Sequence, residues 1–123
     1  MNAMRVLVVD DHAESARLMV KVLNAYGYLV DSAEDYEQAM AKMEDETYDA
    51  FVLDIQLPDI SGVELCKEIK VLQPHAPVLF CSAHAFPAQI DGVLAECGDG
   101  YFTKPVDWDA LAAAIRLHLD PQL

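Results

Sequence analysis

Five short apolar runs alternate along the chain with longer stretches of mixed sequence. Each run contains β-branched or aromatic side chains and is followed by polar or turn-forming residues. Apolar runs of this length between turn formers are typical of strands that are buried on both faces of a sheet. The expected strands are residues 5–9, 28–30, 50–53, 77–81 and 100–103.

Apolar side chains at helical spacing follow each run and predict five helices. Capping residues precede several of these stretches, and glycine follows others. The expected helices are residues 12–26, ended by Gly27; a helix capped by Asp35, with Tyr36, Ala39, Met40 and Met43 on its buried face; a helix capped by Ser61, with Leu65, Ile69 and Leu72 facing inward; residues 87–97, ended by Gly98; and a helix capped by Asp107, with Leu111, Ala112, Ile115 and Leu119 on one face.

The strand–helix order, repeated five times, predicts an α/β fold. Right-handed crossovers place helices on both faces of a parallel sheet, which gives a three-layer sandwich of the flavodoxin-like (βα)5 class. In the flavodoxin-like strand order 2-1-3-4-5, the first and third strands are neighbours, and ligands bind at their carboxyl ends. We expect one domain over residues 1–123 with its core at residues 5–119. Residues 1–3 precede a second methionine and are expected to be an added extension.

Carboxylates follow both of these central strands. Asp10 and Asp11 end the first strand and Asp54 ends the third. Three converging carboxylates repel one another, so a bound cation would relieve them, and all-oxygen ligands in an open crevice favour Mg2+. Taken alone, Asp54 also fits a simple cap of the loop that follows it.

Two further polar side chains are expected at the same edge of the sheet. Ser82 ends the fourth strand and Lys104 ends the fifth. The ammonium group can neutralise an incoming phosphoryl group, and the hydroxyl group can donate a hydrogen bond to one of its oxygens. A carboxylate nucleophile, a metal ion, a lysine and a hydroxyl group are together the parts of phosphoryl transfer to an aspartate.

Residues 5–119 resemble the receiver domain of two-component response regulators. The resemblance rests on four motifs in the family's order and spacing, VLVVDDH, FVLDIQLPDISG, VLFCSAH and GYFTKPV. It implies that Asp54 accepts a phosphoryl group from a phosphohistidine on a histidine kinase or histidine phosphotransfer protein. It also implies a Mg2+ site formed by Asp10, Asp11, Asp54 and the backbone carbonyl of Gln56, and a phosphate site formed by Ser82 and Lys104.

The same resemblance assigns a conformational switch to the domain. Tyr101 occupies the family's switch-aromatic position, partnered by Ser82, and the Lys104-Pro105 peptide bond is expected to be cis. Phosphorylation would shift the population towards an arrangement with Ser82 drawn to Asp54. The surface of the fourth helix, fifth strand and fifth helix would change, and a protein partner or fused output domain would read it. The domain would catalyse only its own phosphorylation and dephosphorylation.

Two loop residues are expected to control how long the phosphoryl group persists. Gln56 and His84 flank the phosphate in the family's arrangement, where side chains regulate the access of water. For His84, a solvated loop histidine is an equally good interpretation. His12, His75 and His118 are interpreted as surface or capping residues, because none has a partner at ligand spacing.

The charge of the chain restricts its partners. A net charge of −13, from 21 acidic and 8 basic residues, opposes direct binding to nucleic acid or to an anionic membrane. No apolar run approaches the ~18 residues of a membrane span, and no signal-peptide pattern begins the chain, so we expect a cytoplasmic protein. Proteins are therefore the expected partners. A homodimer that forms on phosphorylation fits the sequence as well, and both a stand-alone regulator and a domain excised from a larger protein are consistent with it.

The three cysteines are expected to be buried, reduced thiols. Cys66, Cys81 and Cys97 are odd in number, lack CxxC spacing and lie in apolar surroundings. This pattern indicates neither a disulfide framework nor a zinc site.

Other functions fit the sequence less well. A flavodoxin-like cofactor binder needs a phosphate-binding loop rich in small residues after the first strand, where this chain has Asp10, Asp11 and His12. An aspartyl phosphatase needs a general acid and a cap segment, for which the loop after Asp54 is too short. A receiver that no longer cycles phosphate and serves only as a binding module stays open. For Trp108, the sequence fits both a role in packing and a place on a partner surface.

Overall fold

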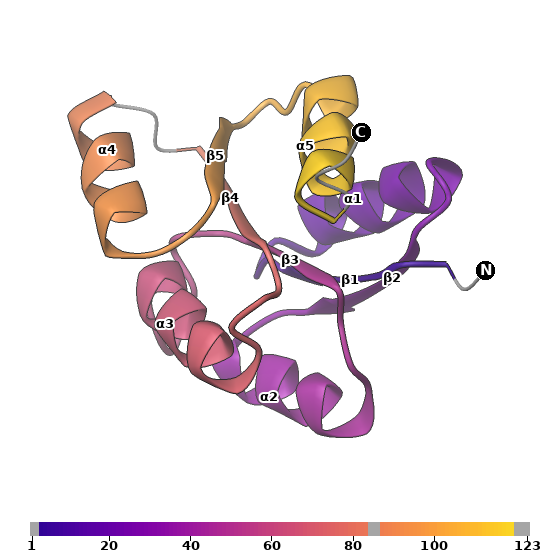
Figure 1. Cartoon of the computed structure of the whole chain (residues 1–123), viewed down its shortest axis with the longest axis horizontal. Helices are drawn as coiled ribbons and strands as arrows, with labels where there is room; N and C mark the ends of the chain where they lie inside the picture. The colour runs from indigo at the N-terminus through magenta and orange to yellow at the C-terminus, as the bar shows by residue number, and fades with distance from the viewer. Residues whose placement is uncertain (1–2, 84–86, 120–123) are drawn as a thin grey trace.

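The structure, a computed structural model, describes residues 3–83 and 87–119 (Figure 1). All five strands are parallel and lie in the order β2-β1-β3-β4-β5, which confirms the predicted order. The strands are β1 Arg5–Val9, β2 Leu29–Ala33, β3 Ala50–Leu53, β4 Val78–Ser82 and β5 Gly100–Thr103; the helices are α1 Ala13–Ala25, α2 Tyr36–Asp45, α3 Gly62–Leu72, α4 Pro87–Glu96 and α5 Trp108–Leu119.

The helices cover the sheet on both faces, as the predicted three-layer sandwich requires (Figure 1). Successive β1 residues face opposite sides: Leu7 and Val9 pack with α2 and α3, whereas Val6 and Val8 pack with α1 and α5. All four side chains are completely buried. The central strands therefore lack a solvent face, which explains their continuous apolar sequence.

Side-chain caps begin three of the helices. The Asp35 carboxylate accepts a hydrogen bond from the Gln38 N–H at 2.8 Å, Ser61 Oγ accepts one from Glu64 at 3.2 Å, and Asp107 accepts one from Ala110 at 3.1 Å. These caps satisfy N–H groups that the first helical turn leaves unpaired, and they confirm the predicted starts of α2, α3 and α5.

Two details of the predicted elements are wrong. Strand β2 extends beyond the predicted residues 28–30 to Ala33, because its polar Asp31 and Ser32 lie on an edge strand that is only partly covered. Leu72, predicted to face inward, is 61% exposed at the end of α3. The helical spacing of apolar residues in the sequence extends to Leu72, which lies beyond the part of α3 that contacts the sheet.

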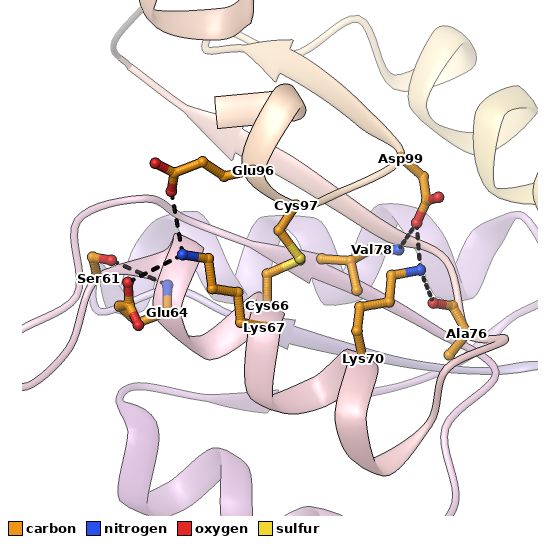
Figure 2. Close-up of a disulfide and its surroundings, with 10 residues drawn as sticks. All are labelled: Ser61, Glu64, Cys66, Lys67, Lys70, Ala76, Val78, Glu96, Cys97 and Asp99. Atoms are coloured by element: carbon orange, nitrogen blue, oxygen red, sulfur yellow. Dashed lines mark hydrogen bonds and ion pairs between the residues drawn. A yellow bond between two sulfur atoms is a disulfide. The ribbon is translucent and has the colours of Figure 1, made fainter. Parts of the chain in front are cut away.

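The prediction of three reduced thiols is wrong for two cysteines. Cys66 on α3 and Cys97 after α4 form a disulfide with their Cα atoms 6.3 Å apart (Figure 2). They are 31 residues apart in sequence, so local spacing gave no signal, and the packing of α4 beside α3 brings them together. Cys81 is free and buried, as predicted.

Within the described part of the chain, no helix combines the length and apolar character needed to cross a membrane.

Candidate functional site

The carboxyl ends of β1 and β3 place two aspartates side by side. Asp10 follows β1 and donates its backbone N–H to Ala33, while Asp54 follows β3 and donates its N–H to Val9 at 2.9 Å. Only 1% of Asp10 and 6% of Asp54 is exposed. Two carboxylates this deeply buried require a cation nearby, because an isolated buried charge is strongly unfavourable.

Lys104 supplies that positive charge. Its Nζ lies 2.7 Å from Asp10 Oδ2 and 3.2 Å from Asp54 Oδ2, and the lysine side chain is itself 20% exposed. Its backbone N–H donates to the carbonyl of Ser82, which fixes the end of β5 beside the end of β4. The peptide bond from Lys104 to Pro105 is cis, as predicted.

The shared ammonium group changes the acidity of its neighbours. Burial raises the pKa of Asp10, but the hydrogen bond from Lys104 and the backbone hydrogen bond from His12 outweigh burial, so the pKa lies below its ordinary value. Burial lowers the pKa of Lys104, but its hydrogen bond and attraction to Asp10 raise the net pKa above the ordinary value. Both groups are therefore charged at neutral pH.

Asp11 and His12 complete the acidic cluster. One ligand atom from each of Asp10, Asp11, His12 and Asp54 lies within 4.8 Å of the others. Carboxylate oxygens are the donors that Mg2+ prefers, and a bound divalent cation would offset the repulsion between them. The oxygen-rich part of the cluster therefore fits this cation. Asp10 is paired with Lys104, and a bound metal ion could take the place of this ammonium group as the positive charge beside the acid.

The ring of His12 contacts this cluster, which the sequence pattern did not predict. Its Nδ1 lies 3.3 Å from Asp10 Oδ1 and 3.2 Å from Asp11 Oδ1, although 72% of the side chain is exposed. His12 begins α1, yet its side chain makes no capping hydrogen bond. The surface position was predicted correctly, whereas the contact with the acids was missed. The available signal was its place directly after the acidic pair.

The loop after Asp54 turns sharply against the acceptor. The Gln56 N–H donates to Asp54 Oδ1 at 3.1 Å, and the Gly62 N–H donates to the carbonyl of Ile55 at 2.7 Å. A Cβ atom at Gly62 would collide with the backbone carbonyl of Asp54. This position therefore requires glycine, because the start of α3 lies directly on the acceptor's backbone.

Ser82 and Tyr101 lie beside the acceptor on β4 and β5. The Ser82 side chain is buried, and its Oγ makes no hydrogen bond of good geometry with the residues that the structure describes. Burial raises the pKa of Tyr101, and the nearby Ser82 hydroxyl partly opposes this rise. The Tyr101 ring packs against Phe80, with centroids 6.2 Å apart. Ser82 therefore keeps a buried donor close to Asp54.

A cleft of about 370 Å³ opens over these residues. It brings together Asp54, Gln56, Ser82 and Lys104, all predicted as site residues, with the His12, Glu14, Ser15 and Ala83 that line its rim. His84, predicted to affect the phosphoryl lifetime, lies outside the described residues.

Other candidate residues have structural partners instead. Asp59 accepts a hydrogen bond from the backbone of Tyr36 and so ties the loop after β3 to the start of α2. The exposed His118 ring contacts the carbonyl of Ala114, one turn earlier in α5. Trp108 packs against the core beneath α1 and α5.

Residues 6–116 match the family model of the response regulator receiver domain. The chain belongs to this receiver family. The match covers most of the chain, and it confirms the resemblance that the four motifs carry.

Individual relatives agree with this assignment. The receiver is 34% identical over 115 residues to the transcriptional regulatory protein TcrA of Mycobacterium tuberculosis, an alignment that covers 94% of this chain and 46% of TcrA. The chain thus spans less than half the length of that relative. The receiver superposes on a CheY-like receiver domain protein from Methanospirillum hungatei with a TM-score of 0.89 at 30% identity, covering 98% of this chain and 97% of the other.

A third similar protein was solved with ligands. TrrA of Thermotoga maritima, in complex with Mg2+-BeF, superposes with a TM-score of 0.83 at 30% identity, and the alignment covers 94% of this chain and 98% of TrrA.

Proposed function

We propose that this receiver accepts a phosphoryl group on Asp54 from the phosphohistidine of a histidine kinase or histidine phosphotransfer protein, in a Mg2+-dependent reaction. One observation carries the proposal: a buried carboxylate, a lysine ammonium group and a buried hydroxyl line the same cleft. A phosphoryl group on Asp54 would give the lysine and the hydroxyl the oxygen partners that their chemistry suits.

The proposed transfer exchanges one bond to phosphorus for another. A carboxylate oxygen of Asp54 attacks the phosphorus atom as the nitrogen–phosphorus bond of the phosphohistidine breaks, and the histidine nitrogen leaves with that electron pair. Lys104, 3.2 Å from the Asp54 carboxylate, pairs with one phosphoryl oxygen. Ser82 donates to another and so gains a hydrogen bond for its buried hydroxyl.

Asp10, Asp11 and Asp54, with the backbone carbonyl of Gln56, would hold the metal ion. Bound Mg2+ supplies positive charge that offsets the repulsion between the carboxylates and the incoming phosphoryl group. Asp10 would give up its 2.7 Å contact with Lys104 when it becomes a ligand, which frees the ammonium group for the phosphate. By analogy with TrrA, we propose that this chain binds Mg2+ together with BeF as a mimic of the phosphorylated state.

The signal would leave the site through Ser82 and Tyr101. As Ser82 moves towards the phosphoryl group, Tyr101 fills the space beside it, and the surface of α4, β5 and α5 changes for a downstream protein or fused output domain. The net charge of −13 supports protein partners over nucleic acid for the domain itself. A cytoplasmic location, and a homodimer that forms on phosphorylation, belong to the same proposal.

The receiver would act only on its own aspartyl phosphate, with Gln56 and His84 controlling the access of water. Replacing His84 by alanine is expected to change the rate at which purified phosphorylated protein loses phosphate. The decay is measured by intact mass, with Gln56→Ala beside it. An unchanged lifetime in His84→Ala would reject the role of this histidine.

Intact mass after incubation with acetyl phosphate tests the acceptor. We expect a gain of one phosphoryl group that requires Mg2+ and disappears in Asp54→Asn, because the amide is a poor nucleophile. Asp59→Asn is the matched control, since Asp59 lies in the same loop but bonds the backbone of Tyr36. No gain in the wild-type protein would contradict the proposal and favour a binding module that does not cycle phosphate.

A further inference from the structure

A disulfide joins α3 to the chain directly after α4 (Figure 2). Cys66 is fully buried among the core residues of α3, whereas Cys97 is partly exposed and packs on the edge of that core. Of the two cysteines, Cys97 is therefore the one nearer to the solvent. The bond closes a covalent loop that contains β4 and α4.

The other contacts across the same helix pair are weaker or lie further along the chain. Lys67 on α3 pairs with Glu96 at the end of α4 at 3.5 Å, but both side chains are about half exposed, so water screens the pair (Figure 2). Lys70 pairs with Asp99 at 2.8 Å, and Asp99 also accepts from the backbone of Val78. These bonds hold the start of β5, whereas the last turn of α4 is held by the partly buried Val93 and Leu94 and by the disulfide at Cys97.

Helix α4 has few other attachments. Among its residues with described side chains, 90–96, none is fully buried, whereas each of the other four helices buries at least one side chain in its described part. Gly92 lies in its middle and lowers its intrinsic helix stability. A covalent link at the end of such a helix restricts its movement more than the same link would in a well-packed helix.

The end of α4 is also connected to the proposed switch. Gly98 has a positive φ and lies directly against the Phe80 ring, where a Cβ atom would collide. Phe80 in turn packs against Tyr101. A movement of Cys97 therefore reaches, through the ring of Phe80, the tyrosine that is proposed to fill the space beside Ser82.

We propose that Cys66 and Cys97 form a reversible thiol–disulfide site, and that the closed bond holds α4 on α3 and so opposes the phosphorylated arrangement of the receiver. The effect on phosphorylation rests on the proposed function, whereas the redox site and the fixing of α4 do not.

The bond forms by exchange with a low-molecular-weight disulfide, RSSR. The Cys97 thiolate attacks one sulfur of RSSR, the S–S bond of RSSR breaks, and one RS⁻ leaves. The Cys66 thiol loses its proton and attacks the Cys97 sulfur, which displaces the second RS⁻. The two protein sulfurs lose two electrons, RSSR gains them, and the two protons yield two RSH. Burial raises the pKa of Cys81 to about 12, so this third cysteine stays protonated and does not compete.

The first experiment counts thiols and needs no phosphorylation. Wild-type protein is incubated with oxidised glutathione, a linear RSSR, or with reduced dithiothreitol, unfolded in acid, and alkylated in denaturant. We expect one alkylated cysteine after oxidation and three after reduction, and stronger hydrogen-exchange protection of α4 in the oxidised protein. Three alkylated cysteines under both conditions would overturn the redox site, and one under both would overturn its reversibility. Equal protection of α4 would overturn its fixing by the bond.

The second experiment measures binding of Mg2+ and beryllium fluoride to the oxidised and reduced proteins. We expect about fivefold weaker binding to the oxidised form, in the usual range of coupling between two sites. Cys97→Ala should bind equally under both conditions, with Lys67→Gln as the matched control that removes only the neighbouring ion pair and keeps the redox dependence. Equal binding in the two redox states of the wild type overturns the coupling. No binding even to the reduced wild type overturns the proposed function instead, and the thiol count and hydrogen exchange then decide the redox site by themselves.

Discussion

At the residue scale, two buried aspartates depend on one lysine. Lys104 contacts both Asp10 and Asp54, and its charge outweighs the burial that would otherwise raise the pKa of Asp10. The lowered pKa means that Asp10 contributes stability above the ordinary aspartate value of 3.8, and that this contribution is lost as the pH falls below it. The site is thus held together by the same charges that its chemistry uses.

Removing the ammonium group should make stability depend on pH in the opposite sense. In Lys104→Met, burial of Asp10 is opposed only by the weaker hydrogen bonds from His12 and Ser15, so we expect the pKa of Asp10 to rise and folding to weaken as the pH rises through the raised pKa. We expect a loss of about 3–5 kcal/mol in the free energy of unfolding at pH 7 without metal, and a smaller loss near pH 4. Urea unfolding at both pH values measures it, with Lys104→Arg as the control that keeps the charge. An equal loss at both pH values would contradict the assigned role of the lysine.

Much of the site could be predicted from the positions of individual polar residues in the sequence. The acids Asp10, Asp11 and Asp54 follow apolar runs, and the carboxyl ends of neighbouring parallel strands meet at one edge. The contact of His12 with two of these acids could not be predicted, since an exposed ring can take several orientations. The closeness of Gly62 to Asp54 was missed for a different reason, because it depends on the path of the loop between them.

At the scale of elements, that loop sets how close α3 approaches the acceptor. Replacing Gly62 by alanine should lower the free energy of unfolding by about 1–3 kcal/mol, because the new Cβ meets the carbonyl of Asp54, which lies in backbone that cannot easily move. Phosphorylation from acetyl phosphate should slow in the same variant. Urea unfolding and intact mass measure the two effects.

Gly92 offers the matched control. It lies inside α4, and a methyl group added to its Cα would meet nothing within 4 Å, so Gly92→Ala should raise the free energy of unfolding by about 0.5–1 kcal/mol through helix propensity. If both alanine variants were destabilised to the same extent, close packing at Gly62 would not be the cause.

The elements themselves were predicted well where local signals were strong. Capping residues fixed the starts of three helices, and the order of the strands followed from the alternation of strand and helix. The errors lie where tertiary contacts decide. Polar residues extend β2 because pairing with β1 continues. Leu72 is exposed because α3 leaves the sheet, and the bond between Cys66 and Cys97 joins elements that are distant in sequence.

At the scale of the whole molecule, the excess of negative charge opposes folding. A net charge of −13 on 123 residues causes repulsion across the compact state, which dissolved salt screens. Three of the acids, Asp10, Asp11 and Asp54, lie together in one cluster, where a divalent cation would act more strongly than screening alone.

Thermal unfolding should separate these two effects. NaCl should raise the midpoint temperature modestly, and Mg2+ at equal ionic strength should raise it further. At ten times its dissociation constant, Mg2+ should add about 1.4 kcal/mol to the free energy of unfolding. For a domain of this size, that corresponds to about 4–6 °C. Asp11→Asn should respond to NaCl like the wild type but lose most of the additional effect of Mg2+. If NaCl and Mg2+ acted alike on the wild type, specific binding at the cluster would be contradicted.

The polar sequence of β2 protects the molecule from its own copies. As an edge strand, β2 has backbone N–H and C=O groups on one side that could pair with a strand of another molecule. Asp31 places a carboxylate on this strand, which accepts a hydrogen bond from the Tyr48 hydroxyl at 2.7 Å and lies 3.9 Å from the Arg5 guanidinium. Like charges from two such edges would repel one another. The residue that shortened the predicted strand therefore helps to prevent the sheet from growing into an aggregate.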